Sequence, residues 1–328
     1  MTIDLRRPGK HTSHLAVRLA DGEEVQLPVT VVHKGDGPTI LFTSACHGDE
    51  YEGPIALFKL VQSLTADDLL CGTVVIAPIL NPPGFAQGVR RVPLDNADLN
   101  RVYPGKADGT ASERIAHAVT TNLLPNCDAH FDLHSGGRDS LIVPSVMIHE
   151  INDPDRMQRT VAAMKAFNAP MGILIKEFDS EGMIDTTSER LGKLFFCAEL
   201  GGVGTPTPET VAITETGIRN VLVHFAMAEG EIKTAPWRGR ERSMVVEALS
   251  FDNYAMAPVG GMFEPLAELE DVVSAGQPFA NIYDTADPAA PPTVCHAPAD
   301  GFVFMRRGFG LVKPGDRLVI IAEHSRRW

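Results

Sequence analysis

Short apolar runs alternate with longer amphipathic stretches from about residue 37 to residue 230. The apolar runs predict strands at 39–44 (TILFTS), 74–80 (VVIAPIL), 129–133 (AHFDL) and 193–198 (KLFFCA). The amphipathic stretches predict helices at 53–64, 111–124, 155–168 and 208–228. Apolar strands separated by helices are typical of a mostly parallel sheet with helices on both faces. The expected fold class of this part is therefore α/β, with a mostly parallel mixed sheet.

The two ends of the chain have a different pattern. Residues 1–36 predict a polar β-hairpin that turns at Asp21 and Gly22. After about residue 235 an internal repeat begins. "APVGGMF" at 257–263 returns as "APADGFV" at 297–303, and "VSAGQPFANI" at 273–282 returns as "VKPGDRLVII" at 312–321. Two copies of one pattern predict two similar β-units that pack against each other.

The repeat resembles the barrel-sandwich of biotinyl and lipoyl domains, which carry a modified lysine at a hairpin tip. The hairpins around Gly261 and Gly301 have no lysine nearby, so a structural or oligomerising role is expected. The chain is thus expected to divide into a domain at 1–238, which includes the N-terminal hairpin, and an all-β domain at 239–328.

Composition narrows the possible partners. The net charge of -13 argues against nucleic acid and anionic membrane surfaces, because both require a basic footprint. No run approaches about 18 apolar residues, and the N-terminus lacks a signal-peptide pattern. The five scattered cysteines fit reduced thiols in a cytoplasmic protein better than a disulfide framework.

The first candidate chemistry lies in "CHGDE", directly after the strand at 39–44. His47 and Glu50 are three residues apart on a loop that opens a helix, so they can face one spot. Imidazole and carboxylate groups both bind zinc, and a catalytic zinc usually has three protein ligands and a water. Alone, such a pair is more often simply solvated, so a third ligand is needed.

"AHFDLHSGG" supplies a candidate third ligand, His134, where the strand at 129–133 ends. Asp132 lies on the same side of that strand and is expected to orient a zinc-bound imidazole. His130 shares this side but lies deeper, where a buried histidine without a ligand role is expected.

The positions of the candidate residues along the chain also favour a binding site, because ligands of open α/β sheets bind beyond the carboxyl ends of the strands. The segments at His47, Asn81, His134 and Glu199 all follow or end predicted strands. Glu199 ends a buried apolar run, where a carboxylate usually has a proton-transfer or binding task.

The long segment at 81–105 is rich in donors that suit a carboxylate, namely Arg90, Arg91, Asn100 and Arg101. The alternative is a surface loop in which Asp95 and Asp98 hold the arginines.

Five motifs together resemble the succinylglutamate desuccinylase/aspartoacylase family of zinc hydrolases, which shares its fold with the zinc carboxypeptidases. They are H-G-D-E at 47–50, N-P-x-G at 81–84, D-x-N-R-x-Y-P-G at 98–105, D-L-H-S at 132–135 and A-E-L-G at 198–201. The resemblance covers about residues 37–230.

The resemblance implies one zinc ion per chain on His47, Glu50 and His134, and Glu199 as general base or acid. It implies that Asn100 and Arg101 bind the substrate carboxylate, and that Arg90 polarises the scissile carbonyl. Arg91 stands beside Arg90, so the choice between the two arginines is open.

The resemblance therefore predicts a zinc-dependent amidohydrolase that removes an acyl group from a small N-acyl amino acid. A homo-oligomer is also expected. "HGDEYEGPIALFKL" and "AELGGVGT" are most similar to the deacetylases of ectoine degradation, which implies N-acetyl-2,4-diaminobutyrate as substrate. Two alternatives stay open, a small-peptide zinc carboxypeptidase and a non-catalytic binding protein on the same fold.

Overall fold

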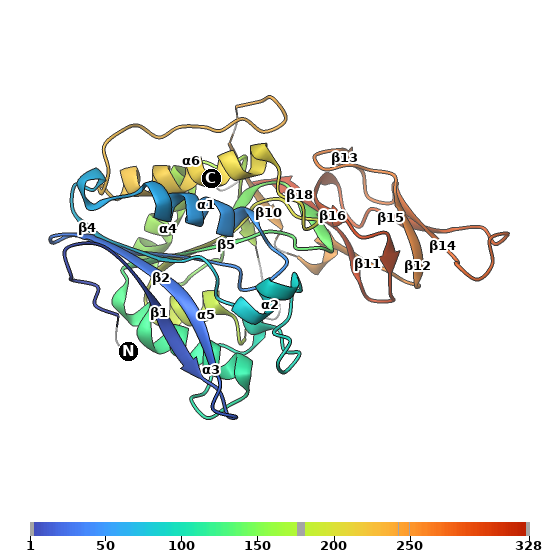
Figure 1. Ribbon diagram of the computed structural model, residues 1–328. Helices are drawn as coiled ribbons and strands as arrows, with labels where there is room; N and C mark the ends of the chain where they lie inside the picture. The colour runs from blue at the N-terminus through green and yellow to red at the C-terminus, as the bar shows by residue number, and fades with distance from the viewer. Residues whose placement is uncertain (1–2, 176–180, 242, 249, 326–328) are drawn as a thin grey trace.

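A large mixed sheet runs through the molecule, with helices on both faces (Figure 1). The computed structural model describes residues 3–175, 181–241, 243–248 and 250–325. Among these residues the sheet has 14 strands. Its main path, in spatial order, is β1 (Gly9–Arg18), β2 (Glu24–Lys34), β4 (Gly72–Ala77), β3 (Thr39–Ser44), β5 (Ala129–His134), β9 (Leu194–Glu199), β7 (Ser145–Ile148), β8 (Met171–Ile175), β10 (Met244–Ala248), β18 (Arg317–His324), β16 (Gly301–Arg307) and β13 (Val272–Val273). Off this path, β6 (Ser140–Ile142) pairs with β16 and β11 (Tyr254–Met256) pairs with β18.

The centre of the sheet is parallel, as the continuous apolar runs predict. β4, β3, β5 and β9 are parallel neighbours. β7 is antiparallel to β9, and the N-terminal hairpin adds β2 antiparallel to β4. All six residues of β3 and of β5 are buried, because helices cover both faces. The expected mixed α/β class is confirmed.

Helices divide between the two faces of the sheet. Their bounds are α1 (Glu52–Ser63), α2 (Pro82–Gln87), α3 (Ala111–Asn122), α4 (Pro154–Phe167), α5 (Ile184–Arg190) and α6 (Pro208–His224), with short 3₁₀ turns at Ala66–Asp68, Leu99–Arg101, Leu124–Asn126 and Phe251–Asn253. α1, α4 and α6 pack together on one face, and α2, α3 and α5 lie on the other (Figure 1). Apolar side chains on each face form a separate core.

Local sequence explains where the predicted helices begin. Thr110 caps α3 by accepting a hydrogen bond from the Glu113 amide, while the Glu113 carboxylate accepts from the Thr110 amide. Thr207 caps α6, whose first residue is Pro208. α6 ends at His224, four residues before the predicted end.

Several elements differ from the sequence prediction. The strand predicted at 74–80 ends at Ala77, since Pro78 follows and cannot donate a ladder hydrogen bond. The segment after Asn81 was expected to be a loop, but it begins with α2, in which Asn81 is the N-cap. β7, β8 and α5 were not predicted.

The C-terminal strands form two connected sheets that project to one side of the α/β part (Figure 1). The smaller sheet consists, in order, of β15 (Thr293–His296), β14 (Pro278–Tyr283), β12 (Gly261–Pro265) and β17 (Leu311–Val312). Each copy of the repeat forms a three-strand unit, β12–β13–β14 and β16–β17–β18. The middle strands are exchanged, because β13 pairs with β16 and β17 pairs with β12.

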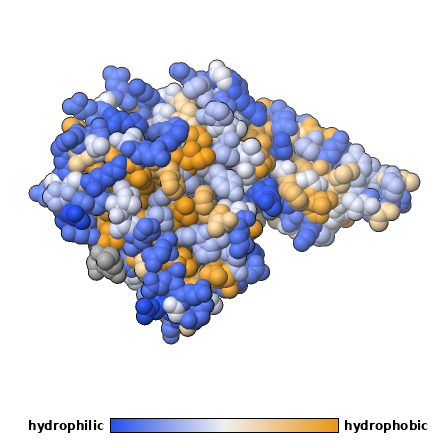
Figure 2. All heavy atoms as spheres, viewed as in Figure 1, coloured by the Kyte–Doolittle hydropathy of each residue, from blue (hydrophilic) through white to orange (hydrophobic). Residues whose placement is uncertain are grey.

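The large sheet links the two parts of the chain. β18 of the second repeat copy pairs with β10, which in turn is parallel to β8. Hydrophilic residues cover much of the visible surface, while hydrophobic residues gather near its centre and on the projecting strands (Figure 2). Within the described residues, no helix has both the length and the apolar character that crossing a membrane requires.

Candidate metal centre and active-site cavity

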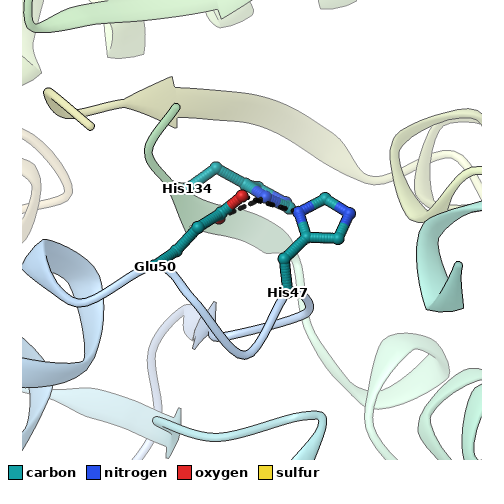
Figure 3. Close-up of side chains that lie close together, drawn as sticks. All are labelled: His47, Glu50 and His134. Carbon is teal, nitrogen blue, oxygen red and sulfur yellow. Dashed lines mark hydrogen bonds and ion pairs between the residues drawn. The ribbon is translucent and has the colours of Figure 1, made fainter. Parts of the chain in front are cut away.

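Polar side chains meet at the carboxyl ends of the central parallel strands. His47 and Glu50 come from the loop that joins β3 to α1, and His134 is the last residue of β5. Glu199 is the last residue of β9 and is the register partner of His134. The convergence expected from strand order is therefore present, and Figure 3 shows the Glu50 carboxylate pointing towards both imidazole rings.

Two local features fix the loop that carries His47. A Cβ atom at Gly48 would lie 2.1 Å from the backbone carbon of Gly84, so the loop packs directly against the start of α2 and needs glycine there. The buried Asn81 side chain accepts a hydrogen bond from the Gly84 amide. Its amide nitrogen donates to the carbonyls of Cys46 and Arg90. The Asn81 side chain thus joins the loop that carries His47 to the loop that carries Arg90.

The three expected ligands surround one point. Glu50 Oε1 lies 2.7 Å from His47 Nδ1, and Glu50 Oε2 lies 3.0 Å from His134 Nδ1 (Figure 3). One ligand atom from each residue lies within 4.8 Å of the others, and no second group of this kind occurs among the residues that the structure describes. All three side chains are buried.

The Nε2 atom of each histidine, which is not the atom close to Glu50, lies near another carboxylate. His134 Nε2 lies 2.7 Å from Asp132 Oδ2, as expected for a residue that orients a ligand. His47 Nε2 lies 3.1 Å from Asp98 Oδ1. Metal-bound histidines almost always have such an outer partner. The donor set is two Nδ1 atoms and one carboxylate, and an outer carboxylate orients each ring. This set fits a divalent ion such as zinc, with one position left for water.

Charge around this point shifts the pKa values of the acidic groups. Burial alone would raise the pKa of Glu50, but the His47 and His134 rings hold it well below its usual range. Glu199 lacks such a partner. Its Oε2 atom is buried and has no hydrogen-bond partner within the described part of the chain. Burial and the negative charge of Glu50 raise the pKa of Glu199 to about 7.

A cavity of about 640 Å³ opens over this centre. Its wall combines both parts of the chain, because Phe304, Arg317 and Ile320 of the C-terminal strands line it together with Glu199 and the metal-site residues. A site of this size suits a small molecule.

The side chains of the two neighbouring arginines have different partners in the structure. Arg90 lines the cavity, with Nη2 3.0 Å from Asp98 Oδ2 and Nη1 3.8 Å from Glu50 Oε1. Arg91 donates instead to the Asn96 carbonyl at 2.9 Å, and it is absent from the cavity wall as far as the described residues define it.

Asn100 and Arg101 both line the cavity. Asn100 Oδ1 accepts a hydrogen bond of 2.9 Å from the Ile184 amide at the start of α5. The NH₂ end of the Asn100 side chain is therefore the end left for a ligand. Arg101 Nη1 donates to the backbone carbonyl of Asn100.

Three residues of the site were missed by the sequence prediction. Asp98 was considered only as support for an arginine loop, yet it holds both His47 and Arg90. The "DLNR" motif was the available signal, since Asp98 stands two residues before Asn100. Asp185 and His149 line the cavity, and the Asp185 carboxylate lies 4.0 Å from His149 Nε2. They come from α5 and from the segment after β7, which were not predicted.

Comparisons with known proteins assign the chain to one family. A family model described as the Succinylglutamate desuccinylase/Aspartoacylase catalytic domain matches residues 36–225. The N-alpha-acetyl-L-2,4-diaminobutyric acid deacetylase of Halomonas elongata is 40% identical over 98% of this chain and 94% of its own length.

Solved structures extend the similarity to nearly the whole chain. The product-bound ectoine utilization protein EutE of Ruegeria pomeroyi has a TM-score of 0.92 and 36% identity, over 98% of this chain and 97% of that one. A succinylglutamate desuccinylase/aspartoacylase from Rhodobacter sphaeroides has a TM-score of 0.93 and 33% identity, over 99% of both chains.

Proposed function

The chain belongs to the succinylglutamate desuccinylase/aspartoacylase family, and from this premise we propose that it is a zinc-dependent deacetylase of Nα-acetyl-2,4-diaminobutyrate. Family membership makes the chain an enzyme that hydrolyses amide bonds, so the alternative of a non-catalytic binding protein is set aside. The observation that carries the proposal is the buried His47, Glu50 and His134 cluster with Glu199 beside it at one end of a shared cavity.

The residues that would hold zinc are His47, Glu50 and His134. A zinc ion there supplies Lewis-acid chemistry, since it lowers the pKa of water towards neutrality and polarises a carbonyl oxygen. Glu199 takes the proton of the attacking water and passes it to the leaving amine. Its pKa of about 7 suits both directions of transfer.

Arginine and amide groups then position the substrate. Arg90, fixed by Asp98, donates to the acyl oxygen as negative charge develops on it. Arg101 and the NH₂ end of Asn100 bind the α-carboxylate and set the amide over the metal centre. The remaining alternative, a small-peptide carboxypeptidase, is less well supported, because C-terminal residues such as Arg317 form part of the wall of the cavity.

Asp185 supports a substrate with a cationic side chain. Its carboxylate lines the cavity with only 6% of the side chain exposed. Burial raises its pKa, so a bound ammonium group would stabilise its charged form. It follows Ile184, whose amide holds Asn100, so an acidic group and a carboxylate-binding amide lie next to each other. A diamino acid carries both groups that these residues would bind, a carboxylate and an ammonium group.

We expect the purified, zinc-supplemented enzyme to release acetate from Nα-acetyl-2,4-diaminobutyrate with a kcat/KM about 10- to 100-fold above that for Nα-acetyl-2-aminobutyrate. The control substrate lacks only the side-chain ammonium group, and a hydrogen bond to a charged group contributes about 1.5–3 kcal/mol. N-succinyl amino acids, N-acetylaspartate and dipeptides complete the panel, with released amine as the measurement. Faster hydrolysis of dipeptides would favour the carboxypeptidase, and equal rates on the matched pair would contradict the cationic specificity.

Arg90→Ala is expected to lower kcat about 10²-fold, the usual effect of removing one donor to a developing oxyanion. Arg91→Ala is the matched control and is expected to change kcat less than twofold, because its guanidinium binds the Asn96 carbonyl. Steady-state kinetics on the acetylated substrate distinguish the two. The reverse pattern would assign the carbonyl to Arg91.

We also propose that residues 239–328 form a barrel-sandwich domain with a structural role, supported by the strand exchange between the repeat copies. A homo-oligomeric state and a cytoplasmic location stay predictions from the sequence.

A further inference from the structure

His130 is the buried histidine for which no ligand role was expected. It lies in β5, four residues before His134, with 0% exposure. Its Nδ1 atom lies 2.8 Å from Ser188 Oγ on α5, and its Nε2 atom lies 2.8 Å from Thr43 Oγ1 on β3. Ser188 and Thr43 are also fully buried, so these hydrogen bonds exclude water.

The direction of each hydrogen bond follows from proton counting. The Thr43 hydroxyl donates to Asp132 Oδ1 at 2.5 Å, because an ionised carboxylate can only accept. Thr43 has no second proton, so it must accept from His130 Nε2–H. Burial lowers the pKa of His130 to about 4, which leaves a neutral ring with one proton. Its Nδ1 atom is then the acceptor, and the Ser188 hydroxyl donates to it.

The chain of hydrogen bonds ends at a metal ligand. Asp132 accepts from Thr43 with Oδ1, and its Oδ2 atom lies 2.7 Å from His134 Nε2. Asp132 thus faces Nε2 of His134, and the other ring nitrogen, Nδ1, faces Glu50 and the candidate metal position. Binding of a metal requires that this nitrogen be free of a proton.

We propose that Ser188, His130 and Thr43 are positioning residues, which fix the rotamer of Asp132 and thereby the ring orientation and tautomer of His134. The inference rests on the metal centre of the proposed function and is independent of the substrate. With both oxygens held, the Asp132 carboxylate cannot rotate away from His134. Strand register supports this geometry, because Thr43 and Asp132 are direct partners between β3 and β5.

The chain offers a matched control in the same sheet. Thr73 on β4 bonds through its hydroxyl to the buried His33 ring on β2, with Oγ1 and Nδ1 2.9 Å apart. Thr43→Val and Thr73→Val each remove one hydroxyl from a buried Thr–His pair. Thr43→Val is expected to lose more thermal stability, because the Thr43 hydroxyl also donates to Asp132, so zinc affinity is compared at a temperature where both variants are folded. Of the two threonines, Thr43 is the one connected to a metal ligand.

Zinc affinity, measured by competition with a chromophoric chelator, is expected to fall about tenfold in Thr43→Val, as for other changes behind a metal ligand. Thr73→Val is expected to stay within twofold of the wild type. Thr43→Ser, which retains the hydroxyl, should restore most of the affinity. If folded Thr43→Val binds zinc as tightly as the wild type, the positioning role is wrong but the metal centre still stands. If the wild-type protein binds no zinc, the metal centre is wrong as well.

A second measurement needs no variant. ¹⁵N NMR of histidine side chains in the wild-type protein at pH 7 should show His130 as a neutral ring with its proton on Nε2. A proton on Nδ1 would reverse the direction of the hydrogen bonds and overturn the inference.

Discussion

Glu199→Gln is expected to lower kcat about 10³-fold while zinc affinity stays close to that of the wild-type enzyme. Proton transfer by a positioned side chain contributes about 10²- to 10⁴-fold, and glutamine has the shape of glutamate without its basicity. Glu199 lies beside His134 in register, and the described residues supply no hydrogen-bond partner for its buried Oε2 atom. The group is therefore placed for proton transfer rather than for holding the fold.

Steady-state kinetics on Nα-acetyl-2,4-diaminobutyrate and zinc content per chain are the two measurements. Glu215→Gln is a suitable control, because Glu215 forms an exposed ion pair with Lys59, with Oε2 and Nζ 3.0 Å apart. Activity near the wild-type level in Glu199→Gln would exclude Glu199 as the base. Loss of both zinc and activity would instead place Glu199 among the ligands.

Removal of the ion is expected to lower kcat/KM by about 10³-fold or more. A catalytic metal contributes several kcal/mol to stabilising charge in the transition state, and about 4 kcal/mol corresponds to about 10³-fold in rate. His134→Ala should have a comparable effect, because it removes one of the three residues that converge on the site.

The experiment compares chelator-treated enzyme, the same sample after addition of zinc, and two histidine variants. Zinc is expected to restore activity to the treated wild type and not to His134→Ala at matched concentration. His14→Ala, which changes an exposed histidine on β1, should behave as the wild type. Full activity after verified removal of the metal would contradict the assignment of a metal centre.

The features that could be predicted from the sequence were those set by continuous hydrophobic runs. β3 was predicted with its observed bounds, because its six apolar or small residues stand between a proline and a turn. The meeting of His47, Glu50 and His134 was also predictable. Parallel central strands bring their carboxyl ends to one edge, and each residue follows or ends such a strand.

The residues that were missed depend on contacts between distant segments. Asp98 reaches His47 because Asn81 bonds to both Cys46 and Arg90 and thus joins the two loops. No local pattern encodes that link. Asp185 enters the cavity through α5, a helix of seven residues that is too short for a clear periodic signal.

The same limit explains the ambiguous pair of arginines. Arg90 and Arg91 are adjacent and chemically identical, so sequence spacing could not separate them. The difference arises from the partners of each side chain, Asp98 for Arg90 and the Asn96 carbonyl for Arg91.

The exchanged strands of the C-terminal repeat have a consequence for folding. Among the described residues, the middle strand of each copy, β13 or β17, pairs with a strand of the other copy. A single copy on its own would expose the backbone donors and acceptors of that strand. The two copies are therefore expected to unfold together, as one cooperative unit.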